Sequence, residues 1–193
     1  MARPCEFCEN DVLEKAMRTF WAKGYDGTSL DDLLTATGIA RQSLYNRFGD
    51  KRSLFLKALQ LYQAKGKEDL GSLFESVHPV SAAFRRLFES VRDETDETKR
   101  MGCFSINAAM EMAHTDVTIA DFITRNQRHF EQLFVSILEQ ARARQELPTD
   151  FDCVAAGRFL VGAFFGLKVL AKSDPSTPML DDMINISLNI FPA

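Results

Sequence analysis

Apolar residues recur every three or four positions along most of the chain, and this spacing places them on one face of successive helices. Groups of Gly, Pro, Ser and charged residues separate the periodic segments. We therefore predict an all-α protein. The segments expected to be helical are residues 11–23, 28–37, 41–48, 51–65 (extending to 76 at most), 82–91, 102–113, 117–143, 151–172 and 179–191, with a charged loop over 93–100 and a turn over 173–178.

The stretch from residue 28 to 51, TSLDDLLTATGIARQSLYNRFGDK, holds two short helical patterns on either side of Gly38. Thr28 or Ser29 can accept backbone N–H bonds, and an Asp follows three residues later, which is the spacing of a capping box. Gly38 tolerates a left-handed turn between helices. Two short helices joined by such a turn form a helix-turn-helix, whose second helix enters the major groove of DNA.

The distribution of charge also favours DNA binding. Residues 41–67 carry seven Lys or Arg against one Asp, a local net charge of +6, although the whole chain carries −4. Residues 1–67 have a net charge of +3 and the remainder has −7. A basic segment in an acidic protein is typical of a surface that binds phosphates. We therefore expect the first part of the chain, and not the second, to bind a nucleic acid.

The run FWAKGYDGTSLDDLLTATGIARQSLYNRFGDKRSLF resembles the DNA-binding domain of the tetracycline-repressor (TetR) family. The matching features are the aromatic-x-x-x-G-Y start, the G-I-A turn, the L-Y-x-x-F second helix and the Lys that follows. The resemblance covers roughly the first third of the chain. It implies an all-helical homodimer that binds a palindromic operator, usually as a repressor released by a ligand. Asn46 and Arg47 stand where the family often has a second aromatic residue or His, so the operator sequence does not carry over.

Residue type and position divide the predicted DNA contacts into two kinds. Tyr45 and Lys51 are expected mainly at phosphates. The residues of the second helix best placed for base edges are Arg41, Gln42, Ser43 and Asn46. In a dimer, two such helices would enter successive major grooves about 34–36 Å apart. The complete predicted DNA-binding set is Thr28, Ser29, Arg41, Gln42, Ser43, Tyr45, Asn46 and Lys51.

We predict a DNA-binding domain over residues 1–66, which includes a linking helix, and a helical effector-binding and dimerisation domain over residues 67–193. The chain has 16 Phe and 7 Met, and most of the Phe fall in the second domain, where they suit an adaptable apolar pocket. An aromatic stripe of this kind can equally be ordinary core. The residues predicted to line a pocket for a small-molecule effector are Phe104, Asn107, Met110, His114, Phe122, Phe164 and Phe165.

The last two helical segments are expected to form the dimer interface, which is a four-helix bundle in the resembled family. Gly157, Gly162 and Gly166 each lower helix stability by roughly 1 kcal/mol relative to Ala. Close approach of another helix would offset that cost. The alternative is that both segments are core helices of one chain.

Cys103 is a candidate sensor thiol. It stands at the start of an apolar helical segment and close to Lys99 and Arg100, and a helix N-terminus and neighbouring cations favour a reactive thiolate. An alternative function is therefore a repressor that senses oxidants or electrophiles through Cys103. Equally, Cys103 can be a small buried apolar residue. A similar Gly-Cys opening marks one subgroup of the resembled family.

Nothing in the sequence points to catalysis, a cofactor or a metal. It contains no Gly-rich phosphate loop, no G-x-S-x-G and no H-E-x-x-H. Cys5 and Cys8 form a C-x-x-C, but no second pair follows at zinc spacing. Glu111 and His114 lie one helical turn apart, whereas bundle metal sites use two such pairs.

The N-terminal residues lack the apolar run of a signal peptide. The longest apolar stretch, residues 159–167, is too short to span a bilayer. We therefore expect a cytoplasmic protein whose partners are double-stranded DNA, a small molecule and a second copy of itself, with no membrane partner.

Overall fold

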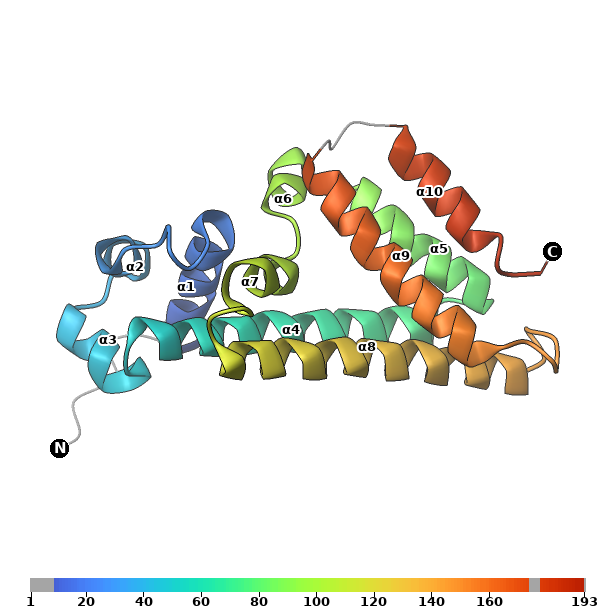
Figure 1. Ribbon diagram of the computed structural model, residues 1–193, viewed down its shortest axis with the longest axis horizontal. Coiled ribbons are helices and arrows are strands. Elements are labelled where there is room, and N and C mark those ends of the chain that lie inside the picture. The colour runs from blue at the N-terminus through green and yellow to red at the C-terminus, as the bar shows by residue number, and fades with distance from the viewer. Residues whose placement is uncertain (1–8, 174–177, 193) are drawn as a thin grey trace. The chain divides into compact units, whose positions relative to one another are not determined.

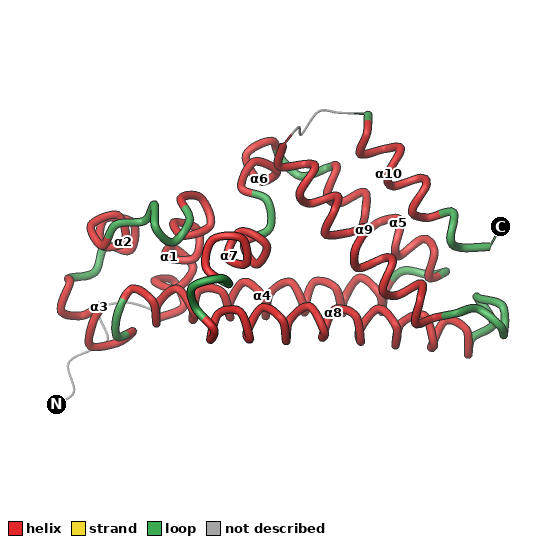
Figure 2. Tube along the Cα trace, in the orientation of Figure 1, coloured by secondary structure: helices red, strands yellow, loops and turns green. Residues whose placement is uncertain are grey.

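The computed structural model describes residues 9–173 and 178–192, and most of these residues are helical (Figures 1 and 2). No strand occurs within these two ranges, and the all-α prediction is confirmed. The helices are α1 (Glu9–Lys23), α2 (Leu30–Thr37), α3 (Arg41–Phe48), α4 (Lys51–Ser76), α5 (Val80–Arg92), α6 (Asp96–Met101), α7 (Phe104–Met112), α8 (Val117–Ala143), α9 (Cys153–Ser173) and α10 (Met179–Leu188).

Contacts within the chain divide it into two compact units. Unit 1 comprises Met1–Gly66 and Phe104–Ala120, and unit 2 comprises Lys67–Cys103 and Asp121–Ala193. The helices α4 and α8 each contribute residues to both units. This grouping differs from the division made along the sequence, because residues 104–120 belong with the helix-turn-helix.

Aromatic side chains pack together in the core of unit 1. Phe20 of α1 and Phe55 of α4 are both fully buried, and their ring centroids lie 5.1 Å apart in an edge-to-face arrangement. Phe104 of α7 also packs on Phe55, with 5.3 Å between the ring centroids. Such edge-to-face pairs add stability beyond the area that they bury. The core of the helix-turn-helix is therefore completed by a helix that lies far along the sequence.

Local capping sets the boundaries of α2 as the sequence predicts. The hydroxyl of Ser29 accepts a hydrogen bond from the backbone N–H of Asp32 at 3.0 Å, and the carboxylate of Asp32 accepts one from the backbone N–H of Ser29 at 2.8 Å. Gly38 ends α2 with a φ of 74°, and its N–H donates to the carbonyl oxygen of Leu34. This left-handed residue turns the chain toward α3.

One predicted loop is wrong. Residues 93–100 contain most of α6, whose N-terminus is capped by Thr95. Its sequence, DETKRM, has no apolar periodicity, so capping and tertiary contacts, and not an amphipathic face, define the helix. Gly102 ends α6 with a φ of 68°, and the next helix therefore begins at Phe104 and not at residue 102.

Unit 2 has an aromatic and aliphatic core formed by α5, α8, α9 and α10, in which Phe84, Phe88 and Phe134 are fully buried. Gly157 of α9 is a point of close approach, because a Cβ there would lie 2.7 Å from Cγ2 of Val135 on α8. The expectation of close helix contact thus holds at this glycine, within a single chain.

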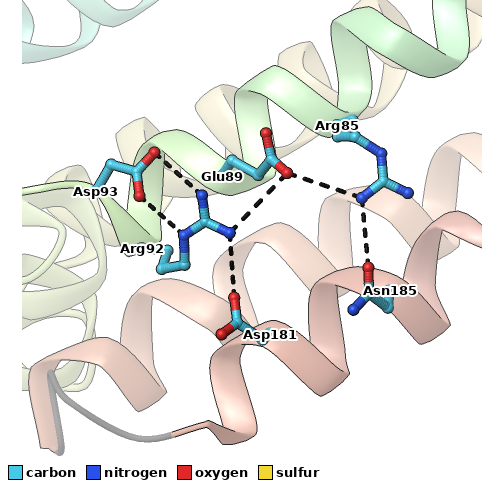
Figure 3. A network of polar contacts seen from close by, with 6 residues as sticks. All are labelled: Arg85, Glu89, Arg92, Asp93, Asp181 and Asn185. Atoms are coloured by element: carbon cyan, nitrogen blue, oxygen red, sulfur yellow. Dashed lines mark hydrogen bonds and ion pairs between the residues drawn. The ribbon is translucent and has the colours of Figure 1, made fainter.

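Polar contacts hold α10 against α5 (Figure 3). The guanidinium of Arg92 donates to Asp181 at 3.1 Å, and that of Arg85 donates to Asn185 at 3.3 Å. Arg92 also pairs with Asp93 at 2.8 Å. These contacts orient α10 so that Ile186, which is 69% exposed, points away from the core.

Candidate nucleic-acid interface

The helix α3 has one buried face and one exposed polar face. Leu44 and Phe48 are inside unit 1, with exposures of 0% and 2%, while Gln42 and Asn46 are exposed. The side-chain amide of Gln42 donates to Oδ1 of Asn46 at 2.8 Å. This pair lies one helical turn apart and presents donors and acceptors outward, which is the chemistry needed to read base edges. Ser43 is half-buried on the same helix.

Tyr45 is an exposed residue of α3, and Lys51 begins α4 shortly after α3 ends. Tyr45 is 43% exposed although it is aromatic. The ammonium of Lys51, in the first turn of α4, lies 4.3 Å from the centroid of the Tyr25 ring. Burial raises the pKa of the Tyr25 phenol, with a further contribution from Asp50, so the ring is neutral beneath the cation. The cation–π contact gives Lys51 a defined position beside α3.

The N-terminus of α4 is capped by Asp50. Its carboxylate accepts a hydrogen bond from the backbone N–H of Ser53 at 2.7 Å. This bond is the largest of the effects that lower the pKa of Asp50. The cap fixes the first turn of α4, and Lys51 with it.

The local positive charge is smaller than a count along the sequence suggests. Four of the seven basic residues between 41 and 67 are ion-paired with carboxylates of unit 1. Three of these pairs are more exposed, contribute little stability and are screened by salt, so a phosphate can replace the carboxylate partner at low cost. In the fourth pair the carboxylate of Asp116 is only 14% exposed, so this pair is a structural contact. The pairs are Arg41–Asp31, Arg47–Glu9, Arg52–Asp116 and Lys65–Glu14.

Thr28 is a correction to the predicted DNA-binding set. Its side chain is fully buried, and its hydroxyl donates to the carbonyl oxygen of Gly24 at 2.5 Å. The hydroxyl therefore stabilises the loop before α2 and does not face a ligand. Ser29 is exposed, but its hydroxyl is engaged in the capping box described above.

The predicted effector-pocket residues fall into different units. Phe104 is a core residue of unit 1, 1% exposed and packed on Phe55 and Tyr62, and its place in a pocket lining stays a prediction. Asn107, Met110 and His114 also belong to unit 1. Met110 is 79% exposed and His114 is exposed, so neither encloses a ligand within that unit.

The other three pocket residues, Phe122, Phe164 and Phe165, belong to unit 2 and are half-buried. The ring of Phe165 packs on Phe130 at 5.5 Å. Phe165 also lines a surface groove of about 370 Å³, between α8 and α9, together with Arg128, Glu131 and Arg158. Three of the residues that line this groove are charged.

Cys103 is 8% exposed and directly precedes α7. Its burial agrees with the interpretation that it is a small apolar residue and argues against a thiol that is open to oxidants. Cys5 and Cys8 lie outside the described residues. Within residues 9–173 and 178–192, no three His, Cys, Asp or Glu side chains are grouped to hold a metal ion.

Sequence reasoning predicts no role at the nucleic-acid interface for Tyr25 or Glu111. The carboxylate of Glu111 accepts hydrogen bonds from the backbone N–H groups of Tyr25 at 2.8 Å and Asp26 at 2.7 Å. The Gly-Tyr pair before α2 is one signal for Tyr25, because it belongs to the motif of the resembled family. No signal connects Glu111 to this loop, since 86 residues separate it from Tyr25.

Comparison with known proteins agrees with this geometry. Residues 12–58 match the family described as "Bacterial regulatory proteins, tetR family", and residues 81–185 match "Tetracyclin repressor-like, C-terminal domain". The chain is 35% identical to the HTH-type transcriptional regulator YezE of Bacillus subtilis, over 99% of this chain and 100% of that protein. It is 29% identical to the HTH-type transcriptional repressor ComR of Escherichia coli, over 98% and 91% of the two chains.

Among solved structures, the chain resembles a cysteine mutant of the TetR family regulator CifR in complex with 26-bp double-strand operator DNA. The TM-score is 0.85 at 28% identity, over 99% of this chain and 100% of that one. The reduced form of NemR from Escherichia coli shares the fold with a TM-score of 0.84 at 17% identity, over 95% and 97% of the two chains.

Proposed function

Because the chain belongs to the TetR family of bacterial transcriptional regulators, we propose that it is a cytoplasmic repressor that binds a palindromic operator as a homodimer and releases it when a small-molecule effector binds. The observation that carries this proposal is the exposed polar face of α3 beside Lys51. The family consists of DNA-binding regulators and not enzymes.

In the proposed complex, α3 enters the major groove. Gln42 and Asn46 meet base edges, since amide side chains offer both a donor and an acceptor. Arg41 reaches a base or a phosphate after leaving Asp31, and Ser43 and Ser29 are secondary contacts. Tyr45 and Lys51 bind phosphates on either side of α3 and so fix its register. Two copies would place these helices about 34–36 Å apart.

The proposed dimer forms through α9 and α10. Phe159 and Val169 on α9 are 48% and 47% exposed, and Ile186 on α10 is 69% exposed. A Cβ added to Gly162, on the same face of α9, would meet no described atom within 4 Å, so this position leaves room for a partner helix. Exposed apolar side chains of this size are candidates for a protein interface.

A membrane is the competing occupant of this surface. By length and composition alone, α9 could span a bilayer, and 33% of its most apolar window is buried within the chain. However, α9 carries Arg158 and Lys168, which are ion-paired with Glu131 and Glu94. Charged groups in the middle of a bilayer cost several kcal/mol, about 2.5–3.5 each on insertion scales. We therefore propose a second copy of the chain as the partner.

The effector is proposed to act on unit 2. Asn126 on α8 is 5% exposed, and its Oδ1 has no hydrogen-bond partner among the described residues. A buried acceptor without a partner is costly, and a ligand with a hydrogen-bond donor would satisfy it. Because α4 contributes residues to both units, a change in unit 2 can alter the spacing of the two α3 helices. The effector shifts this equilibrium only by its different affinities for the two states.

The proposal is tested by replacing Tyr45 and Lys51 together with Ala and measuring binding to the operator by gel shift. We expect a loss on the order of 10- to 100-fold, since two phosphate contacts disappear. Arg86→Ala, an exposed residue of unit 2, removes one positive charge without touching α3 and should bind normally. Unchanged affinity of the double variant would remove the proposed role of this face.

A further inference from the structure

We infer that Glu111 of α7 is a positioning residue for operator binding, which acts through Tyr25 on the phosphate-binding ammonium of Lys51. This inference rests on the proposed function, because it requires that Lys51 contacts DNA. It concerns contacts within unit 1 alone. Glu111 itself has no direct contact with DNA in the proposed complex.

The first step is the pair of hydrogen bonds between the carboxylate of Glu111 and the loop between α1 and α2. Both carboxylate oxygens are used: Oε2 accepts from the N–H of Tyr25 at 2.8 Å and Oε1 accepts from the N–H of Asp26 at 2.7 Å. Hydrogen bonds to a charged acceptor are about twice as strong as neutral ones. The carboxylate therefore fixes the backbone of Tyr25.

Gly24 leaves the space that the carboxylate of Glu111 needs to make these hydrogen bonds. Its φ is 76°, a conformation that favours glycine, and a Cβ at this position would lie 2.9 Å from Oε2 of Glu111. The glycine thus serves two purposes, since it turns the chain out of α1 and leaves space for the carboxylate.

The second step runs from the backbone of Tyr25 to its ring. The ring lies edge-to-face with Phe55 at 5.1 Å and is stacked with Phe20 at 6.2 Å. Both phenylalanines are fully buried. With its backbone held by Glu111 and its ring held by two core residues, the side chain of Tyr25 has one defined orientation.

The third step is the cation–π contact. The ammonium of Lys51 lies 4.3 Å from the ring centroid, within the range in which the ring quadrupole attracts a cation. A long Lys side chain loses conformational entropy when it binds a phosphate, and an ammonium that is already positioned loses less. Release of Tyr25 would therefore weaken the phosphate contact without altering the charge of Lys51.

The residue next to Lys51 is held by the same segment of the chain. The guanidinium of Arg52 donates to Asp116 at 2.5 Å and 2.8 Å. Asp116 also accepts from the backbone N–H groups of Thr118 and Ile119 and so caps α8. The segment 111–116, which leads directly into α8, therefore holds both the loop beneath Lys51 and the start of α4. Any movement of this segment is passed to the phosphate-binding lysine.

A double-mutant cycle tests the inference. The variants are Glu111→Ala, Lys51→Ala and the two combined, and the probe is a duplex with the inverted repeat that the wild-type protein selects from a random library. We expect each single variant to weaken binding on the order of 3- to 10-fold. The double variant should bind no more weakly than Lys51→Ala alone, because Glu111 acts through Lys51.

The salt dependence of binding provides a second readout, which a loss of fold stability alone would not reproduce. Loss of one phosphate contact lowers the slope of log K against log salt by about 0.9, and both single variants should show this change. Removal of the Glu111 charge would by itself strengthen DNA binding, so weaker binding cannot be a simple charge effect. Glu111→Gln, which keeps the size of the side chain, serves if the Ala variant unfolds, and Met110→Ala at the exposed neighbouring position should behave as wild type.

The outcomes separate the two proposals. If the wild-type protein selects no inverted repeat, the proposed function fails. If it selects one and Lys51→Ala weakens binding, but the effect of Glu111→Ala is additive or zero, the inference about Glu111 is wrong and the proposed function stands. A Lys51→Ala variant with full affinity would also overturn the inference.

Discussion

Arg52 and Asp116 form an ion pair with two contacts, from Nε to Oδ2 and from Nη2 to Oδ1, although 64 residues separate them in the sequence. Arg52 lies in the first turn of α4, and Asp116 lies at the corner between α7 and α8. Parallel N–H donors to a carboxylate fix geometry as well as distance. The pair therefore connects the first turn of α4 to the residue just before α8, within unit 1.

This pair predicts a specific dependence of stability on pH. The hydrogen bonds from Arg52 lower the pKa of Asp116 from 3.8 to about 2. Because the pKa is lower in the folded than in the unfolded chain, the stabilisation is fully present above about pH 5 and is lost as the pH falls through about 2. Asp116→Asn should lower the Tm at pH 7 by a few degrees, and its Tm should approach that of the wild type near pH 2.

Thermal unfolding followed by circular dichroism between pH 7 and pH 2 measures this difference. Asp121→Asn, at an exposed position on α8, is the matched control and should follow the wild type throughout. A constant Tm difference between Asp116→Asn and wild type at all pH values would contradict the assignment.

The buried hydroxyl of Thr28 predicts a variant that affects folding and not DNA contact. Thr28→Val keeps the shape of the side chain but removes the donor to the carbonyl of Gly24, which should cost about 1 kcal/mol. Chemical denaturation measures that cost, and operator affinity per folded molecule should remain unchanged. Thr35→Val, at an exposed position of α2, should leave stability within about 0.5 kcal/mol. A Thr28→Val protein of normal stability with weakened operator binding would restore Thr28 to the DNA-contact set.

The exposed apolar residues of α9 and α10 predict which substitutions would break the proposed dimer. Glu in place of both Phe159 and Ile186 buries two charges in the proposed interface, so the protein should become monomeric at micromolar concentration. Val117→Glu introduces a charge at another exposed apolar position, 74% exposed, and should leave self-association intact. Sedimentation velocity distinguishes the species. If the Phe159 and Ile186 variant still dimerises, the interface lies elsewhere.

Replacement of Asn126 should raise the stability of the protein and weaken its response to the effector. Asn126→Leu removes the unpartnered Oδ1 from the interior of unit 2, and we expect the free energy of unfolding to rise by about 1 kcal/mol. The same change should reduce the affinity for any effector that donates a hydrogen bond at this site. Chemical denaturation tests the first part, and a titration that releases the operator tests the second. A less stable variant with a normal effector response would contradict both.

Most helices and the helix-turn-helix follow from local sequence. Periodic apolar positions define α1, α5 and α8, and Ser29 and Gly38 set the limits of α2 by contacts within a few residues. The sequence predicts a loop where α6 lies, because this helix is short and lacks an apolar face. Local patterns therefore determine where long helices lie, but short capped helices depend on their surroundings.

The candidate site was only partly predictable for a related reason. The exposed face of α3 follows from the burial of Leu44 and Phe48 at helical spacing. In contrast, the partners of Arg47, Arg52 and Lys65 lie 38, 64 and 51 residues away. A count of charges over residues 41–67 therefore does not include the carboxylates that neutralise them. The residue type of Phe104 suits a pocket lining, whereas tertiary packing places it in the core of unit 1.

Recognition of one inverted repeat by two copies of α3, held in a dimer, underlies the proposed function. It is tested by the stoichiometry of the purified protein on a selected inverted-repeat duplex at about 150 mM salt, determined by sedimentation with labelled DNA and compared with a duplex in which one half-site is scrambled. We predict two chains per intact duplex and a loss of affinity of at least about 100-fold when one half-site is scrambled. A monomer on the intact duplex, or equal affinity for the two duplexes, would contradict this mechanism.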